Sequence, residues 1–323
     1  MTSRILVVIP LSLFCFARAP AAATLDPSLL QQWNRHAKLP CRAPFLATFK
    51  KDGKEITFLA VNHIEGPVKA SESELSLVAQ QVKQIGPSGI LIEMDTGGGN
   101  LSREYLRSIY SNCIDKDGKF FCGEASYAAL TAGRENANAA VLGGEPSRSA
   151  LQTELGKKLS REDHLAFESL KTVISMKREG LPATEWSKVF NQRLKNNLSS
   201  FSTDEWSYEK FSTWLRKNMG VSIDRVEDQW MEPRSDAGAS RMQKIAAQVG
   251  QIREPMILSA AERLINGSTK TMIVYGSSHY FKQLPAYEKA FGRPEVECLE
   301  PVPRAKTAPD PVETESEPSS SAR

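Results

Sequence analysis

The sequence predicts an α/β protein with a mixed, largely parallel sheet flanked by helices and a helical insertion between two α/β halves. Residues 56–94 have the pattern of a strand, a helix and a second strand, an order that favours parallel strands joined by a right-handed crossover. Residues 160–252 carry helical spacing, and residues 270–299 return to strand, helix and strand. The 323 residues are 41% hydrophobic, which is enough apolar material for a buried core.

Apolar runs and amphipathic spacing define the elements of the first half. The clearest helix covers residues 72–85, because its apolar residues share one face and Gly86 and Pro87 then stop it. The other predicted elements are strands at 56–61, 89–94 and 139–142 and a helix that begins after Asn100.

The second half begins with a capped helix. Ser160, followed three residues later by Asp163, is typical of a helix start. Helical spacing continues to residue 252, and we expect Pro255 to kink or end a long helix before a further helix runs to Gly267. The remaining predicted elements are a strand at 270–275, a helix at 283–291 and a strand at 296–299.

The two ends of the chain differ in composition from the rest. Arg4, an apolar run and three alanines before Thr24 predict an export signal at residues 1–23. Residues 301–323 contain Pro, Ser, Glu and Lys with little apolar material, which predicts a disordered tail. We therefore expect a periplasmic or secreted protein with one domain at 24–300, a helical insertion at about 155–252, and no integral membrane segment after processing.

Export would leave four cysteines in an oxidising compartment. Cys113 and Cys122 flank a turn-forming segment, which predicts a disulfide between them and leaves Cys41 and Cys298 to form a second. A metal site built from the four thiolates is the alternative, although the sequence has no CxxC pair.

The charge balance narrows the choice of partners. The 41 basic and 38 acidic residues give a net charge of +3, too small to steer the protein onto nucleic acid. We expect a peptide or small-molecule substrate and no nucleic-acid partner, and the sequence carries no indication of the oligomeric state.

Polar side chains follow four of the predicted strands. In open α/β sheets, ligands bind outside the carboxyl ends of parallel strands, and those positions hold His63, Glu93, Glu145 and His279. Two imidazoles with one or two carboxylates can bind catalytic Zn²⁺, Mn²⁺ or Fe²⁺ and leave a coordination position open. His164 lacks this context, and its acidic and basic neighbours predict a solvated helix face.

Residues 59–63 and 274–279 resemble the paired GxxH motifs of the TraB/GumN/Tiki superfamily, which is related to the erythromycin esterases and the ChaN haem-binding proteins. The second motif, Gly276 to His279, is intact, whereas Ala60 replaces the glycine of the first. Glu93 and Glu145 fall where the family has acidic residues. The resemblance covers roughly residues 56–299 and is strongest at the two ends of that range.

The resemblance implies a metal-dependent hydrolase of peptide or ester bonds. His63 and His279 would hold a divalent cation with Glu93 or Glu145, and the carboxylate left off the metal would act as general base. Relatives of the esterase type use a motif histidine as general base, which implies a catalytic role for His279 as well. Arg253 resembles an arginine that the family often carries, and we expect it to bind a substrate carboxylate.

Two other classes of function fit parts of the sequence. In a non-catalytic binder of metal or haem, as the ChaN-like relatives suggest, the same cluster would capture its ligand without turnover. In a serine peptidase resembling the Clp and signal-peptide-peptidase fold, residues 92–99 would form a strand and glycine turn, with Ser126 as the nucleophile. The glycine run matches neither GxGxxG nor GxxxxGK[ST], so a dinucleotide or phosphate loop is not expected.

Overall fold

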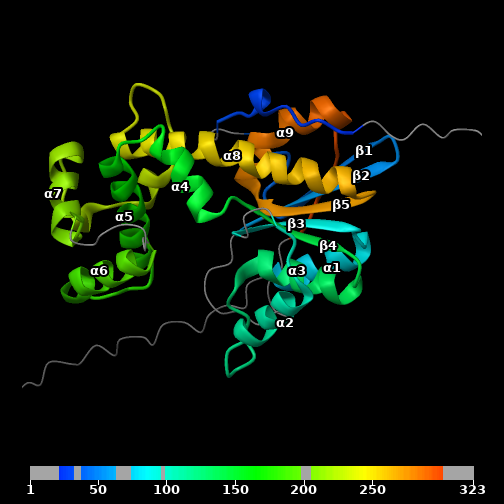
Figure 1. Cartoon of the computed structure of the whole chain (residues 1–323), viewed down its shortest axis with the longest axis horizontal. Coiled ribbons are helices and arrows are strands. Elements are labelled where there is room, and N and C mark those ends of the chain that lie inside the picture. Colours follow the sequence, from blue (N-terminus) through cyan, green and yellow to red (C-terminus); the bar gives the residue numbers. More distant parts are fainter. Residues whose placement is uncertain (1–21, 33–37, 63–73, 96–98, 198–204, 301–323) are drawn as a thin grey trace, which may run out of the picture.

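A six-stranded mixed sheet with helices on both faces forms the body of the protein (Figure 1). The computed structural model describes residues 22–32, 38–62, 74–95, 99–197 and 205–300. The strand order is β4-β3-β5-β2-β1-β6. The strands are β1 (Phe45–Lys51), β2 (Lys54–Val61), β3 (Gly89–Asp95), β4 (Ala140–Glu145), β5 (Lys270–Gly276) and β6 (Glu295–Cys298).

Four neighbouring strands, from β4 at one edge of the sheet through β3 and β5 to β2, are parallel, which confirms the predicted fold class. β2 pairs with β5, β5 with β3, and β3 with β4, all in parallel. The register places Val61 opposite Gly276 and Asp95 opposite Glu145. The carboxyl ends of these strands therefore lie along one edge of the sheet.

The strand β1 was not predicted from the sequence. It runs antiparallel to both β2 and β6. The β1–β2 hairpin turns at Asp52 and Gly53, whose φ angles of 51° and 76° are those of a two-residue hairpin turn. An Asp-Gly pair between apolar runs is a strong hairpin signal, so this strand could have been found from the sequence.

Helices cover the two faces of the sheet in separate groups (Figure 1). One face carries α1 (Glu74–Ile85), α2 (Arg103–Asn112) and α3 (Gly123–Glu135), and the other carries α8 (Arg241–Gly267) and α9 (Ser277–Phe291). Alternate residues of β5 face the two layers: Val274 packs toward α1 and α3, and Tyr275 packs toward α8 and α9. This alternation follows from the two-residue repeat of a strand.

A second helical block lies between β4 and β5 in the chain and to the left of the sheet in Figure 1. It contains α4 (Arg148–Gly156), α5 (Arg161–Arg178), α6 (Trp186–Asn197) and α7 (Tyr208–Met219). Ser160 caps α5 as predicted, because its side chain accepts a hydrogen bond from the Asp163 amide. The block has its own core, which includes Phe190, Phe211 and Trp214.

Helix α8 continues through Pro255 and does not end there. Its first half packs in the helical block through Met242 and Ile245, and its second half packs on the sheet through Leu258 and Leu264. A proline inside a helix costs about 3 kcal/mol, and burial of the apolar residues on both sides offsets that cost. The helix therefore joins the helical block to the sheet.

Both predicted disulfides are present. Cys113 pairs with Cys122, and Cys41 pairs with Cys298, with Cα atoms 5.3 Å and 5.8 Å apart respectively. Among the described residues, no helix combines the length and the apolar character needed to cross a membrane. Most of the predicted export signal and the predicted tail at 301–323 lie outside the described residues.

Candidate metal centre

Two carboxylates stand at the ends of neighbouring strands. Glu93 is near the end of β3, and Glu145 is the last residue of β4. The sequence predicted that this strand would stop at residue 142, but β4 continues through Gly143 and Gly144 to Glu145. A Cβ atom on Gly144 would lie 2.2 Å from the Tyr275 hydroxyl oxygen, so a larger residue at this position would displace the Tyr275 side chain that lies over it.

His279 reaches the same edge of the sheet from the first turn of α9. This helix begins at Ser277, six residues earlier than predicted, and continues through Pro285. The imidazole of His279 is 3% exposed. Its Nε2 lies 3.4 Å from Glu93 Oε1, and its Nδ1 lies 2.9 Å from Glu254 Oε1.

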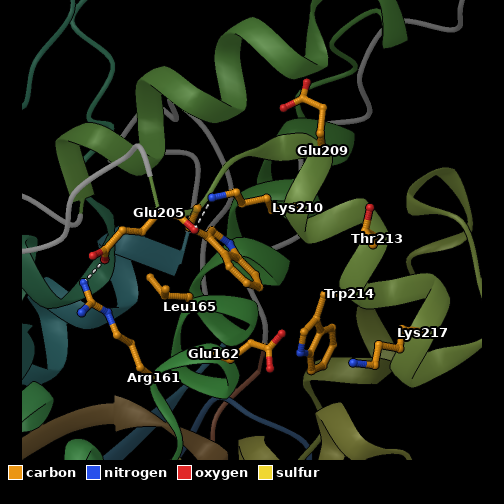
Figure 2. A pocket seen from close by; sticks show the side chains of 10 residues that line it. Arg161, Glu162, Leu165, Glu205, Glu209, Lys210, Thr213, Trp214 and Lys217 are labelled. Carbon is orange, nitrogen blue, oxygen red and sulfur yellow. Dashed lines mark hydrogen bonds and ion pairs between the residues drawn. The ribbon is translucent and has the colours of Figure 1, made fainter.

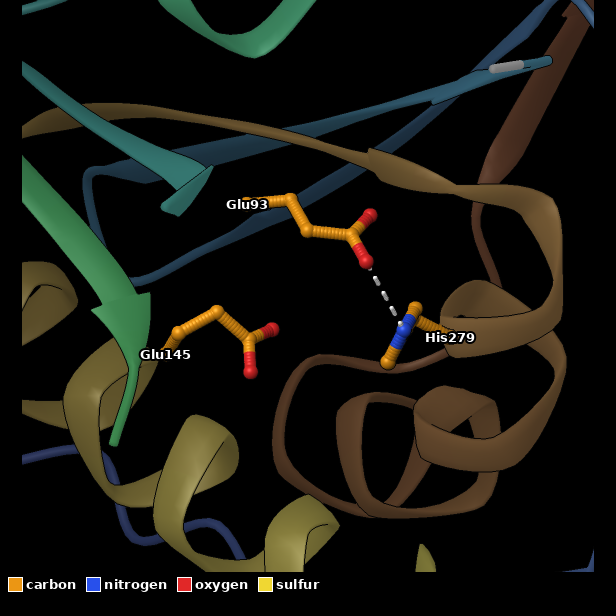
Figure 3. Close-up of side chains that lie close together, drawn as sticks. All are labelled: Glu93, Glu145 and His279. Atoms are coloured by element: carbon orange, nitrogen blue, oxygen red, sulfur yellow. Dashed lines mark ion pairs between the residues drawn. The ribbon is translucent and has the colours of Figure 1, made fainter. Parts of the chain in front are cut away.

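The side chains of Glu93, Glu145 and His279 point toward one another (Figure 3). One ligand atom from each lies within 4.8 Å of the others, close enough for all three to contact one cation. Three of the four predicted ligands therefore converge. The fourth, His63, lies outside the described residues. The side chain of Asn62, which directly follows β2, donates a hydrogen bond to the Ala43 carbonyl.

The Arg253 guanidinium lies between the two strand-end carboxylates. Its Nε is 2.5 Å from Glu145 Oε2, and its Nη2 is 2.6 Å from Glu145 Oε1 and 3.1 Å from Glu93 Oε1. Burial alone would lower the pKa of Arg253, but the hydrogen bond and charge of Glu145, with the charges of Glu93 and Glu254, raise it. Sequence analysis expected Arg253 to bind a substrate carboxylate, whereas here it binds two carboxylates of the protein.

Glu254 belongs to the cluster and was missed in the sequence. It is 4% exposed and contacts His279, Lys282 and Gln283. Its position on the helix could have indicated a buried carboxylate. Ile257 and Leu258, three and four residues later, are buried on the same helix face, and an acidic residue on an apolar stripe requires a partner.

The electrostatics couple His279 to Glu254. Burial would raise the pKa of Glu254, but the charge and hydrogen bond of His279 and the ammonium of Lys282 lower it to about 2. Burial would likewise lower the pKa of His279, but the charge of Glu254, its hydrogen bond and the contact with Glu93 raise it. These contacts therefore favour a protonated imidazole, which with Arg253 and Lys282 balances three carboxylates.

A cavity of about 500 Å³ opens between this cluster and the helical block. Glu93, Glu145 and Arg253 line its inner end, and residues of α4 and α5 line the remainder. His164 also lines it and is 5% exposed, so the predicted solvated position is wrong. Position 164 falls on the face of α5 that carries Phe167 toward the cavity, and burial lowers the pKa of this imidazole.

A second and more open cavity, of about 710 Å³, lies against α5 and α7 (Figure 2). Leu165, Trp206 and Trp214 supply its apolar surface, and Arg161 forms an ion pair with Glu205 at its rim. Within the described ranges, Glu93, Glu145 and His279 are the only group of three or more His, Cys, Asp or Glu side chains close enough to contact one cation.

The donor set fits a divalent transition metal. Carboxylate oxygen and imidazole nitrogen are ligands of Zn²⁺, Mn²⁺ and Fe²⁺. Metal-binding histidines commonly direct their second nitrogen to a carboxylate, and Glu254 holds Nδ1 of His279 in that way, so Nε2 faces Glu93. Arg253 would have to release at least part of its contact with the two carboxylates.

No family model, curated protein or solved structure matches this chain. The candidate site is therefore defined by the convergence of Glu93, Glu145 and His279 and by the Glu254 carboxylate behind the imidazole.

Proposed function

We propose that this chain is an exported, metal-dependent hydrolase of peptide or ester bonds, related to the TraB/GumN/Tiki superfamily. The single observation that carries the proposal is the convergence of Glu93, Glu145 and His279 within 4.8 Å. The two disulfides suit an oxidising compartment.

Glu93 and His279 would hold the metal, with His63 as a further expected ligand and Glu145 either as a ligand or as the general base. The pairing of Val61 with Gly276 supports His63, because it aligns the end of β2 with the start of α9. A bound divalent cation would polarise the scissile carbonyl and lower the pKa of a coordinated water. Glu254 would keep the His279 imidazole oriented through Nδ1.

Glu145 is the candidate general base, because it lines the cavity where a substrate would lie. Its two oxygens now accept hydrogen bonds from Arg253. A rotation of Arg253 away from Glu145 would free a carboxylate oxygen to take a proton and would turn the guanidinium toward the substrate. Arg253 would then stabilise negative charge that develops on the reacting carbonyl.

The cavity suits a peptide or a small ester. Its volume of about 500 Å³ is in the range of small-molecule sites. Phe167, Leu151 and Val249 offer apolar contacts, and Lys171 and Glu168 offer charges of both signs. These groups lie on the helical block, so the block would contribute to substrate selection.

The decisive experiment combines metal analysis with activity. Purified protein should contain or take up one Mn²⁺, Zn²⁺ or Fe²⁺ per chain and should cleave members of a peptide and ester panel, and a chelator should stop the cleavage. His279→Ala should lose metal and activity together. Glu145→Gln should keep most metal and lose turnover if Glu145 is the base, and lose both if it is a ligand. Glu154→Gln, on α4 and outside the cluster, is the matched control.

A non-catalytic metal or haem binder is the second candidate. The two hydrogen bonds from Arg253 to Glu145 favour it, because they occupy both oxygens of the candidate general base and leave neither free to take a proton. One bound metal per chain with no turnover on the panel would select this reading.

The serine-peptidase candidate depends on Ser126. This serine is buried in α3, which covers the face of the sheet opposite to α9 and His279. Activity that resists chelator and is abolished by Ser126→Ala would replace the metal proposal.

A further inference from the structure

Three arginines converge on a separate cavity of about 320 Å³ between α2 and α3. Arg103 and Arg107 come from α2, and Arg134 comes from the last turn of α3. Leu106 and Leu130 form an apolar floor, and Tyr110 stands at the side. We call this cavity the arginine pocket.

The arrangement leaves positive charge without a carboxylate partner. Among the residues that the structure describes, none of the three guanidinium groups forms an ion pair. Arg103 and Arg107 are four residues apart on one helix face, where like charges repel. Arg103 donates to the Ala137 carbonyl at 2.7 Å, which anchors it at the pocket without neutralising it.

Tyr110 and Arg134 are stacked, with the guanidinium carbon 4.4 Å from the ring centroid. A cation over an aromatic face is held by the ring quadrupole, so the guanidinium plane is fixed while its N–H groups at the edge remain able to donate. Close packing of the helices also defines the floor: a Cβ atom on Gly133 would lie 2.9 Å from Leu106 Cδ1. The pocket is thus shaped by contacts that do not consume its charge.

We propose that the arginine pocket binds a phosphate ester. The forked N–H groups of arginine match phosphate oxygens in pairs, and three such groups at one cavity suit a group of charge −1 to −2. The apolar floor and the Tyr110 ring would contact the organic part of the ester. The ester is either a soluble small molecule or the headgroup of an anionic phospholipid. The arginine pocket is separate from the candidate metal centre, which lies at the strand ends beside α8 and α9, the helices on the opposite face of the sheet from α2 and α3.

Calorimetric titration of the full chain, in chelator so that no metal recruits phosphate, tests this directly. The probe is phenyl phosphate, with benzyl alcohol as the uncharged comparison. Phenyl phosphate should bind with a stoichiometry of one, and added salt should weaken the binding. Arg107→Gln and Arg134→Gln should each weaken it about tenfold, as expected for the loss of one charge-assisted hydrogen bond.

Arg216→Gln is the matched control, because it removes one exposed arginine from α7 in the distant helical block. Flotation with phosphatidylglycerol or phosphatidylcholine vesicles distinguishes the two sources of the ester. Binding to phosphatidylglycerol alone, lost in Arg107→Gln and Arg134→Gln, assigns the lipid headgroup. Binding of phenyl phosphate assigns a soluble ester. Absence of binding to both phenyl phosphate and phosphatidylglycerol overturns the proposal. So does equal binding of benzyl alcohol, or an equal loss in Arg216→Gln. Thermal unfolding of each variant checks that these surface changes leave the fold intact.

Discussion

The carboxylate of Glu254 lies 2.9 Å from Nδ1 of His279, and both side chains are almost fully buried. The two residues belong to different helices, α8 and α9, that cover the same face of the sheet. Through this contact a helix that begins in the distant helical block orients a side chain at the strand ends. Four of the predictions below concern this region.

Glu254→Gln should weaken metal binding about tenfold to a hundredfold, because the imidazole loses the carboxylate that fixes its orientation and raises its basicity. Calorimetric titration with Zn²⁺ or Mn²⁺ measures the change, and Glu154→Gln is the control for loss of one negative charge. Equal affinity in Glu254→Gln and the wild type would show that Glu254 only supports the fold.

The stability of the metal-free protein should depend on pH through the same pair. On folding, the pKa of Glu254 falls from its ordinary 4.5 to about 2. The stability that the ionised carboxylate gives the folded protein is therefore fully present above pH 4.5 and is lost as the pH falls toward 2. The pKa of His279 is raised above 6.5, so its contribution is present below pH 6.5 and lost as the pH rises through the folded-state value.

The free energy of unfolding should therefore differ most between the wild type and Glu254→Gln from pH 4.5 to 6.5, by about 2 kcal/mol. Urea denaturation in chelator, repeated across the pH range, measures this difference. A difference that does not vary with pH contradicts the assigned ionisation states.

Arg253→Met should destabilise the metal-free protein by about 3 kcal/mol, because it leaves Glu93 and Glu145 partly buried without their counter-ion. The same change should strengthen metal binding, since the cation no longer competes with a guanidinium. Thermal unfolding with and without Mn²⁺ should show a larger metal-induced rise in Tm for Arg253→Met than for the wild type. An equal rise would mean that Arg253 and the metal do not compete.

Gly144→Ala should cost up to about 3 kcal/mol of stability, because its Cβ would lie 2.2 Å from the Tyr275 hydroxyl oxygen. That hydroxyl is buried and makes no hydrogen bond within the described part of the chain. Tyr275→Phe should therefore be neutral or stabilising by about 1 kcal/mol. In the Tyr275→Phe background, Gly144→Ala should cost at least about 1 kcal/mol less, and a double-mutant cycle by urea denaturation tests that coupling.

Loss of the Cys41–Cys298 disulfide should destabilise the protein more than loss of Cys113–Cys122. The first joins residues 257 apart and the second joins residues 9 apart, and the stabilisation expected from the unfolded chain grows with loop length to about 4 kcal/mol or more. Paired Cys→Ser variants compared by denaturation test the order, and non-reducing peptide mapping should recover both linked pairs. Four free thiols would contradict the assignment.

Several elements were determined by local sequence. The helix α1 ends at Ile85, as its apolar face and the following Gly86 and Pro87 predict. The predicted N-cap at Ser160 is also confirmed, because it depends on a contact with a residue only three positions along the chain. Strand ends position side chains by a general rule of parallel sheets, which is why Glu93, Glu145 and His279 could be proposed as one site without knowledge of the fold.

Two features of the structure depend on long-range packing and not on local sequence. Pro255 does not end α8, because two separate cores hold the helix on either side of it. His164 has charged neighbours in sequence, yet the approach of the helical block to the strand ends buries it.

Local patterns along the chain were enough to predict the fold class, the disulfide pairs and three of the residues that converge at the strand ends. The contacts of Arg253 with two of those residues, and of Glu254 with the third, are visible only in the folded protein. Adjacent residues of a helix point about 100° apart, so Arg253 can face the sheet edge while Glu254 faces α9. The partners of these two side chains depend on how α8 lies across the sheet. The position of α8 is set by packing between segments more than 100 residues apart in the chain.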